Sequence, residues 1–253
     1  MTPATPAGTS LRVALLYPEL LGTYGDGGNA QVLRQRCRWR GIDCEVTTVA
    51  IGDPVPATAD IYLLGGGEDA AQTAAVAELA AARGLQAAAD QGAVIFGVCA
   101  GYQLLGEWFL DGEGRQTDGL GVLDARTARL DTRAVGEIVA EPVGLPGLPV
   151  LTGFENHGGR TTLGAAARPL AAVRTGVGNG DRGAEGAVQG RVIATYLHGP
   201  ALARNPALAD YLIGLVVGEL APLDDGLVER LRAERLGAHR RRPPRRFGLG
   251  SQP

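Results

Sequence analysis

Short runs of apolar, β-branched residues alternate with alanine- and leucine-rich stretches along most of the chain. This alternation is typical of a parallel β-sheet covered by helices, because parallel strands need a crossover connection that is usually helical. The pattern predicts strands at 11–17, 43–49, 61–64, 93–96 and 193–197. It predicts helices at 29–40, at 69–91 with a break near Gly84, at 102–109 and at 206–219.

Residues 119–192 follow a different pattern, with many glycines, alternating β-branched residues and few helix signals. That pattern predicts antiparallel strands or long loops at the edge of the sheet. Beyond Pro222 the chain becomes arginine-rich and too poor in apolar residues to form a core, which predicts a disordered tail. We therefore expect one α/β domain over 1–220 and a tail over 221–253. The tail is either a solvated terminus or a contact for nucleic acid or acidic lipid.

The composition limits the chemistry that the chain can perform. The formal charge of -3 gives no general reason to expect nucleic acid or an anionic membrane as a partner. All 24 basic residues are arginine, so a mechanism that needs a lysine amine is excluded. The three cysteines, at 37, 44 and 99, form neither a metal-binding pattern nor an even set for disulfides. They indicate a reducing, cytoplasmic location and no metal site.

Residues 94–103 carry the most informative motif, a buried apolar strand followed by Gly-x-Cys-x-Gly and a helix. This is the form of a nucleophile elbow, in which a strained turn exposes the nucleophile and glycines at both second positions avoid obstruction. Cys99 would sit at a helix N-terminus, where free N–H groups and the helix dipole favour a thiolate. The alternative is a small buried cysteine that only packs behind a strand.

A thiolate nucleophile needs a proton acceptor, and the chain has three histidines. His198 closes the strand at 193–197, at the carboxyl edge where open α/β sheets place their sites. His157 lies in a glycine-rich stretch and is a candidate for the substrate wall or for a structural role. His239 lies in the arginine-rich tail and is a poor candidate. His198 is therefore the predicted base.

Acyl transfer also needs N–H donors for the developing oxyanion. A triple glycine at 65–67 follows a predicted strand and allows the backbone to approach a ligand closely, although it can also form a simple tight turn. We expect Gly66 and Gly67 to supply backbone donors here. Ala100, the residue after the nucleophile, would supply another.

Residues 25–30 fit a dinucleotide-binding pattern, G-x-G-x-x-A before a helix, with Glu45 near the place of a ribose-binding acid. However, residues 18–24 separate this loop from its strand, whereas a dinucleotide fingerprint turns directly off the strand. A helix cap, a rim of the active site or a partner surface is the favoured interpretation.

The segments 97–106 and 196–200 resemble the class I glutamine amidotransferases, in particular their cobyric-acid-synthase-like branch. Three further segments resemble the GatD-type glutaminase subunits of lipid II isoglutaminyl synthases: 24–29, 65–72 and 153–157. The likeness covers about residues 11–220 and leaves the tail unmatched. It implies a flavodoxin-like α/β fold with a mostly parallel sheet, helices on both faces and a β-rich segment near 119–192.

The resemblance also implies a reaction, in which Cys99 attacks the side-chain amide of L-glutamine, forms a thioester and releases ammonia. In the GatD-type subunits an arginine between the elbow and the loop at 153–157 holds the carboxylate of glutamine. Arg133 is the matching position, with Arg126 and Arg129 as close rivals. The resemblance places Gln103 among the substrate-binding residues. The alternatives are a glutaminase for another amidation, such as that of a corrinoid, and a non-catalytic binding or redox-sensing module.

Two features of the sequence point to a partner. Pro200 stands where many class I members carry the acid of His-x-Glu. Either Cys99 and His198 act alone as a dyad, or an acid comes from elsewhere in this chain or from a partner. Amidation of a carboxylate needs ATP, yet the chain has no P-loop motif and no lysine. The resemblance implies a heterodimer with a MurT-type, Mur-ligase-like subunit. That partner would hold ATP and Mg²⁺ and amidate the D-glutamate of lipid II in peptidoglycan synthesis. We expect this chain itself to hold no cofactor, to bind no nucleic acid and not to insert into a membrane.

Overall fold

A six-stranded sheet forms the centre of the structure, a computed structural model that describes residues 10–145, 147–180 and 183–241. The strand order is β11-β12-β4-β3-β1-β2, and all neighbouring pairs are parallel except β11 with β12. The strands β3, β4 and β12 are buried along their whole length, as expected for central strands. The bounds are β1 Ser10–Leu16, β2 Asp43–Val49, β3 Ile61–Leu64, β4 Val94–Val98, β11 Ala187–Gln189 and β12 Val192–Thr195.

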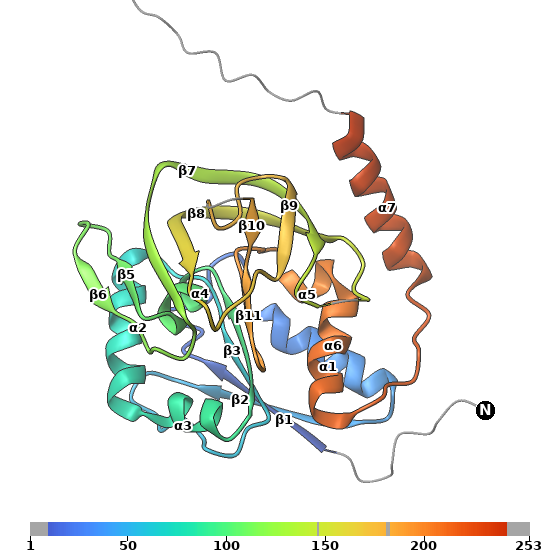
Figure 1. The fold of residues 1–253 in the computed structure, drawn as a ribbon. Helices are drawn as coiled ribbons and strands as arrows, with labels where there is room; N and C mark the ends of the chain where they lie inside the picture. Colours follow the sequence, from blue (N-terminus) through green and yellow to red (C-terminus); the bar gives the residue numbers. More distant parts are fainter. Residues whose placement is uncertain (1–9, 146, 181–182, 242–253) are drawn as a thin grey trace, which may run out of the picture. The chain divides into compact units, whose positions relative to one another are not determined.

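Helices cover both faces of this sheet, with α1 and α6 side by side on one face and α2 and α3 on the other (Figure 1). The predicted break near Gly84 is present, because α2 ends before Arg83, which adopts a left-handed conformation. The observed α/β architecture therefore confirms the predicted fold class. The bounds are α1 Gly28–Trp39, α2 Asp69–Ala82, α3 Gly84–Asp90, α4 Ala100–Leu105, α5 Ala201–Arg204 and α6 Pro206–Val217.

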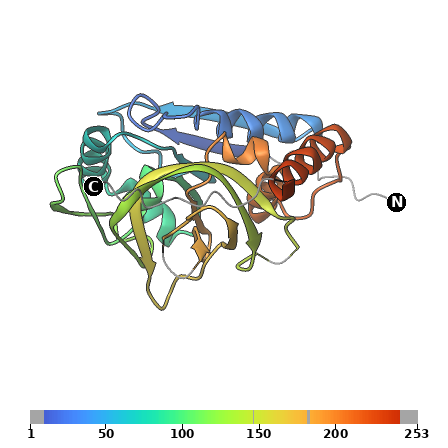
Figure 2. The same cartoon turned by 90° about the horizontal axis from the view of Figure 1, so that it is seen from above.

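A second sheet, with order β10-β9-β7-β5-β6 and β8 paired to β7, occupies most of the segment predicted to be antiparallel. Its centre is the long β7–β8 ribbon, in which β7 curves across the molecule (Figure 2). The register shifts between Arg129 and Ala134, so that residues 130–133 of β7 lie opposite Gly158 alone. This bulge contains Arg133. The bounds are β5 Trp108–Leu110, β6 Gln116–Asp118, β7 Ala125–Pro142, β8 Leu151–Leu163, β9 Ala171–Thr175 and β10 Ala184–Glu185.

The helix predicted at 102–109 is shorter in the structure. It ends at Leu105, Gly106 is extended, and Trp108–Leu110 form a strand that pairs with both β6 and β7. Aromatic residues are stabilised in strands by packing, and Phe109 is fully buried in this strand. The burial explains why Trp108 and Phe109 form a strand and not a further helical turn.

The C-terminal residues form a separate unit from Pro222 onward. The prediction of disorder does not hold for Gly226–Arg241, which form helix α7. Leucine, arginine, glutamate and alanine dominate this stretch, and all are strong helix formers. The arginine-rich run from 242 onward lies outside the described residues. Across the described part of the chain, no helix is long and apolar enough to cross a membrane.

Candidate active site

Cys99 lies in the turn between β4 and α4 with φ 53° and ψ -103°, a strained conformation for a residue with a side chain. The two flanking glycines permit the turn. A Cβ atom at Gly97 would lie 2.7 Å from Leu105 Cδ1, and one at Gly101 would lie 2.6 Å from the carbonyl oxygen of Leu64. The predicted elbow is therefore present, and both glycines are required by close packing.

His198 follows β12 and is fixed on both sides of its backbone. Its N–H donates to the carbonyl of Phe154 at 2.9 Å, and its carbonyl accepts from Phe154 N–H at 3.2 Å. The side chain is 1% exposed, and its Nδ1 lies 2.9 Å from Oδ2 of Asp26. The other ring nitrogen, Nε2, is buried and has no hydrogen-bond partner among the described residues, and His198 and Cys99 line the same pocket. This arrangement of cysteine, histidine and carboxylate is that of a catalytic triad.

Asp26 is the orienting acid for which the sequence analysis found no candidate. It lies 172 residues before His198, in the loop between β1 and α1, and is 2% exposed. Pro200, which replaces the usual acid, packs on this loop, since a Cβ at Gly28 would lie 2.6 Å from its Cγ. The loop noted for its dinucleotide-like glycines therefore forms part of the site. The sequence carries one signal of this role, since Asp26 stands between glycines beyond the carboxyl end of a strand.

The three side chains converge on Gly66, in the turn after β3. A Cβ at Gly66 would lie 2.7 Å from His198 Cε1, 3.1 Å from Asp26 Oδ2 and 3.5 Å from Cys99 Cβ. Only a glycine leaves room for this convergence. The N–H of Gly66 donates to Asp26 Oδ2 at 2.9 Å, so in this geometry it holds the acid and is not free for the predicted oxyanion.

The surroundings of His198 favour its protonated form. Burial lowers the pKa of the imidazole, but the interactions with Asp26 and Cys99 outweigh it and raise the pKa to about 10. Near neutral pH the imidazole ring is therefore protonated on both nitrogens. An imidazolium beside a thiolate is the ground state of an activated cysteine nucleophile.

Two other predicted oxyanion donors, Gly67 and Ala100, line the pocket beside Cys99. Ala100 is the first residue of α4, where the N–H groups of the first turn have no partner within the helix. The arrangement leaves these two backbone groups as the candidates for stabilising an oxyanion next to the sulfur.

The pocket wall includes both Gln103 and His157. The amide of Gln103 donates to Tyr196 Oη at 3.2 Å and accepts from Gln72 Nε2 at 2.8 Å. His157 bonds through Nδ1 to the carbonyl of Gly159 at 3.0 Å, and its ring stacks on Tyr196 at 3.7 Å. His157 is thus a wall residue turned away from the base position. The side chain of His239 lies outside the described residues.

Arg133 is the arginine of the predicted trio that lines the pocket. The β7 bulge carries it there, and its Nε donates to Asn156 Oδ1 at 2.6 Å. Arg126 pairs with Glu107 at 2.7 Å, and Arg129 lies 3.9 Å from Asp69 and is half-exposed. The structure therefore favours Arg133 as the group available to a substrate carboxylate.

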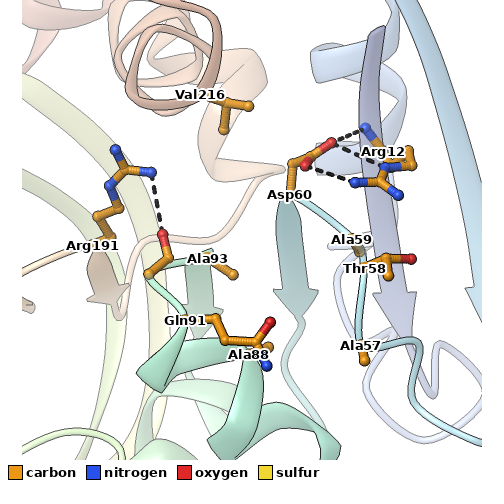
Figure 3. Close-up of a pocket in the computed structure, with 11 residues that line it drawn as sticks. Arg12, Ala57, Thr58, Ala59, Asp60, Ala88, Gln91, Ala93, Arg191 and Val216 are labelled. Carbon is orange, nitrogen blue, oxygen red and sulfur yellow. Dashed lines mark hydrogen bonds and ion pairs between the residues drawn. The ribbon is translucent and has the colours of Figure 1, made fainter.

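A larger hollow of about 370 Å³ lies at the other end of the sheet, where β3, β4 and β12 begin (Figure 3). Arg12 faces Asp60 there at 3.2 Å, and Arg191 donates to the carbonyl of Gly92 at 3.1 Å. Its charged side chains are satisfied by each other or by backbone, and it holds no cysteine or histidine. Of these two hollows, the smaller one brings a cysteine and a histidine together.

Residues 12–206 match the CobB/CobQ-like glutamine amidotransferase domain. The chain belongs to this family. Among curated relatives, the GatD subunit of lipid II isoglutaminyl synthase from Staphylococcus aureus is 37% identical over 76% of this chain and 79% of its own length. The corresponding subunit from Streptococcus pneumoniae is 33% identical over 80% and 79%. Cobyric acid synthase from Sphingopyxis alaskensis is 34% identical, but the match covers only 35% of that longer protein.

Solved structures agree with the family at the level of the fold. A crystal structure of a glutamine amidotransferase aligns with a TM-score of 0.56, 22% identity and coverage of 81% of this chain and 98% of the other. PurLQS from Thermotoga maritima aligns with a TM-score of 0.53 and 15% identity. The predicted branch, the fold class and the classification as a glutamine amidotransferase are therefore confirmed.

Proposed function

We propose that this chain is the glutaminase subunit of a lipid II isoglutaminyl synthase, and that it hydrolyses L-glutamine to supply ammonia to a MurT-type ligase. The observation that carries the chemistry is the buried Cys99–His198–Asp26 group at the elbow. The observation that favours this pathway is the extent of the similarity. The match spans 79% of the GatD subunits, at 37% and 33% identity, but only 35% of a cobyric acid synthase.

The reaction begins when the thiolate of Cys99 attacks Cδ of the glutamine side chain. The amide oxygen becomes an oxyanion within reach of the N–H groups of Gly67 and Ala100. His198, held by Asp26, then gives its proton to the departing nitrogen, and ammonia leaves a γ-glutamyl thioester. A water molecule, deprotonated by His198, attacks the thioester and releases glutamate. The guanidinium of Arg133 holds the α-carboxylate throughout.

The acceptor reaction belongs to a second chain. Activating a carboxylate needs ATP and Mg²⁺, and this sequence has neither a P-loop nor a lysine. The Mur-ligase-like partner would bind both and amidate the α-carboxyl of D-glutamate in the stem peptide of lipid II. The reaction would take place in the cytoplasm, where the partner meets ATP.

The test is to co-purify the full-length chain with its Mur-ligase-like partner and to measure glutamine- and ATP-dependent amidation of lipid II by mass spectrometry. We expect the Cys99→Ala complex to lose amidation with glutamine and to regain it with free ammonium. If the wild-type complex hydrolyses glutamine but leaves lipid II unchanged, the pathway is wrong and the glutaminase chemistry stands. Corrinoid amidation would then be assayed next.

A further inference from the structure

Asn156 is the meeting point of three segments that are far apart in the sequence. Arg133 on β7 donates from Nε to its side-chain oxygen at 2.6 Å and from Nη2 to its carbonyl at 3.4 Å. Its amide nitrogen donates to the hydroxyl of Tyr24, which lies in the loop before Asp26. Its carbonyl oxygen is 4.0 Å from the sulfur of Cys99. One side chain thus ties both rims of the pocket together above the nucleophile.

These contacts hold Tyr24 over the base. The tyrosine ring lies 4.9 Å from the His198 ring and 6.0 Å from that of Phe154. Its φ of 58° is unfavourable for a bulky residue, and the side chain is 48% exposed. A strained, half-exposed residue stays in place only when its contacts outweigh the strain, and the bond to Asn156 is one of those contacts.

The pocket beside Cys99 is small and partly open to solvent. Its volume is about 40 Å³, which is room for about three water molecules. Tyr24, Arg133 and Asn156 line this pocket together with Cys99, so a substrate whose amide reaches the sulfur meets their contacts.

The charge of Arg133 indicates how a substrate could break the contacts of Asn156. Asn156 offers the guanidinium a neutral oxygen, whereas the α-carboxylate of an amino acid offers an anionic and bidentate partner. A carboxylate therefore competes well for Arg133. Once Arg133 has turned to the ligand, Asn156 loses its strongest contact and its hold on Tyr24 weakens.

We infer that Asn156, with Arg133 and Tyr24, forms a latch over Cys99, and that the α-carboxylate of the substrate opens it by taking the place of Asn156 on Arg133. The inference rests on the proposed function, because it takes glutamine as the substrate. It makes Asn156 a specificity-determining residue, since an amide without an adjacent carboxylate does not release the latch. The cost of opening appears in the apparent affinity, because only the open fraction binds.

Two variants that remove the latch test this. Tyr24→Phe deletes only the hydroxyl that meets Asn156, and Asn156→Ala deletes both side-chain contacts. One hydrogen bond contributes about 1 kcal/mol, so we expect the KM for glutamine to fall roughly two- to tenfold in either variant. The double variant should differ little from Asn156→Ala, because both changes break the same contact. Alkylation of Cys99 by the neutral reagent iodoacetamide, without glutamine, should accelerate by a similar factor.

The measurements are made on the full-length chain, alone and with its partner, and Tyr211→Phe on α6 is the matched control with unchanged values. If KM rises in Asn156→Ala, the residue is a substrate contact and the latch is wrong. Unchanged KM and alkylation rates in both variants, with active wild type, also overturn the latch while the glutaminase function stands. An inactive wild-type complex refutes the function and the latch together.

Discussion

Charged side chains lie at both ends of the central sheet, but they are partly exposed at the amino end and buried at the carboxyl end. At the amino end, Asp60 is 23% exposed, its partner Arg12 is 50% exposed, and the hollow beside them measures about 370 Å³. At the carboxyl end, Asp26 and His198 are at most 2% exposed, and the space beside them measures about 40 Å³. Convergence and burial of reactive groups, and not the size of a hollow, therefore distinguish the carboxyl end.

The largest effect is expected from the nucleophile. Cys99→Ala should reduce glutamine hydrolysis by at least about 10⁴-fold, to the background, because no other group can form the thioester. Cys44 lies near the amino end, in β2, and Cys44→Ala should keep full activity. The measurement is glutamate release by the complex. A Cys99→Ala protein with substantial turnover would contradict the assignment.

The second effect distinguishes Asp26 at the carboxyl end from Asp60 at the amino end by their influence on kcat. Asp26→Asn should lower kcat by about 10² to 10⁴-fold, because His198 loses the carboxylate that orients it and favours its proton. The loss of that carboxylate also lowers the pKa of His198 from about 10, so the basic limb of the pH–rate profile should move to lower pH. Asp60→Asn at the amino end should leave both quantities unchanged. If both variants changed kcat and the pH–rate profile equally, Asp26 would not be the acid that orients His198.

The third effect concerns Glu185, which is buried and accepts bonds from Thr195 and from Tyr196 N–H next to the base. Burial raises its pKa from 4.5 to about 7 despite these bonds. The folded state then holds a proton that the unfolded state releases, so stability falls as pH rises from about 4.5 to 7. Glu185→Gln removes this loss. Between pH 4 and 8 the variant should gain roughly 3 kcal/mol relative to wild type, measured by urea unfolding. A constant difference across pH would contradict the prediction.

The smallest effect is expected from the arginines. Arg133→Ala should raise the KM for glutamine by roughly 10- to 100-fold, with a smaller change in kcat, because one charged hydrogen-bonding partner of the substrate is lost. Arg191→Ala at the amino end and Arg126→Ala on β7 should leave KM unchanged. A larger effect of Arg126→Ala would make that rival position the carboxylate site.

The sequence alone predicts the parts that depend on local patterns. Two strands have the predicted bounds, 43–49 and 61–64, because each is a β-branched or apolar run between turns. The elbow at Cys99 is visible because its glycines, strand and helix are contiguous. These features need only neighbours in the chain.

The parts that the sequence does not predict depend on distant contacts. Asp26 meets His198 across 172 residues, and the local pattern around either residue does not identify the other as its partner. The local pattern at Trp108–Leu110 predicts helix, because the strand in β7 with which this segment pairs begins beyond it in the chain. The low apolar content of Gly226–Arg241 predicts disorder, whereas the high helix propensity of the same residues agrees with the observed helix α7.

The distribution of the triad along the chain has a consequence for synthesis in the cell. The acid follows the first strand, the nucleophile follows β4, and the base follows β12, the last strand of the sheet to leave the ribosome. A nascent chain that carries Cys99 but has not yet docked β12 has a thiol with no proton acceptor. We therefore expect incomplete chains not to hydrolyse glutamine, because His198 reaches the site only when β12 pairs with β4.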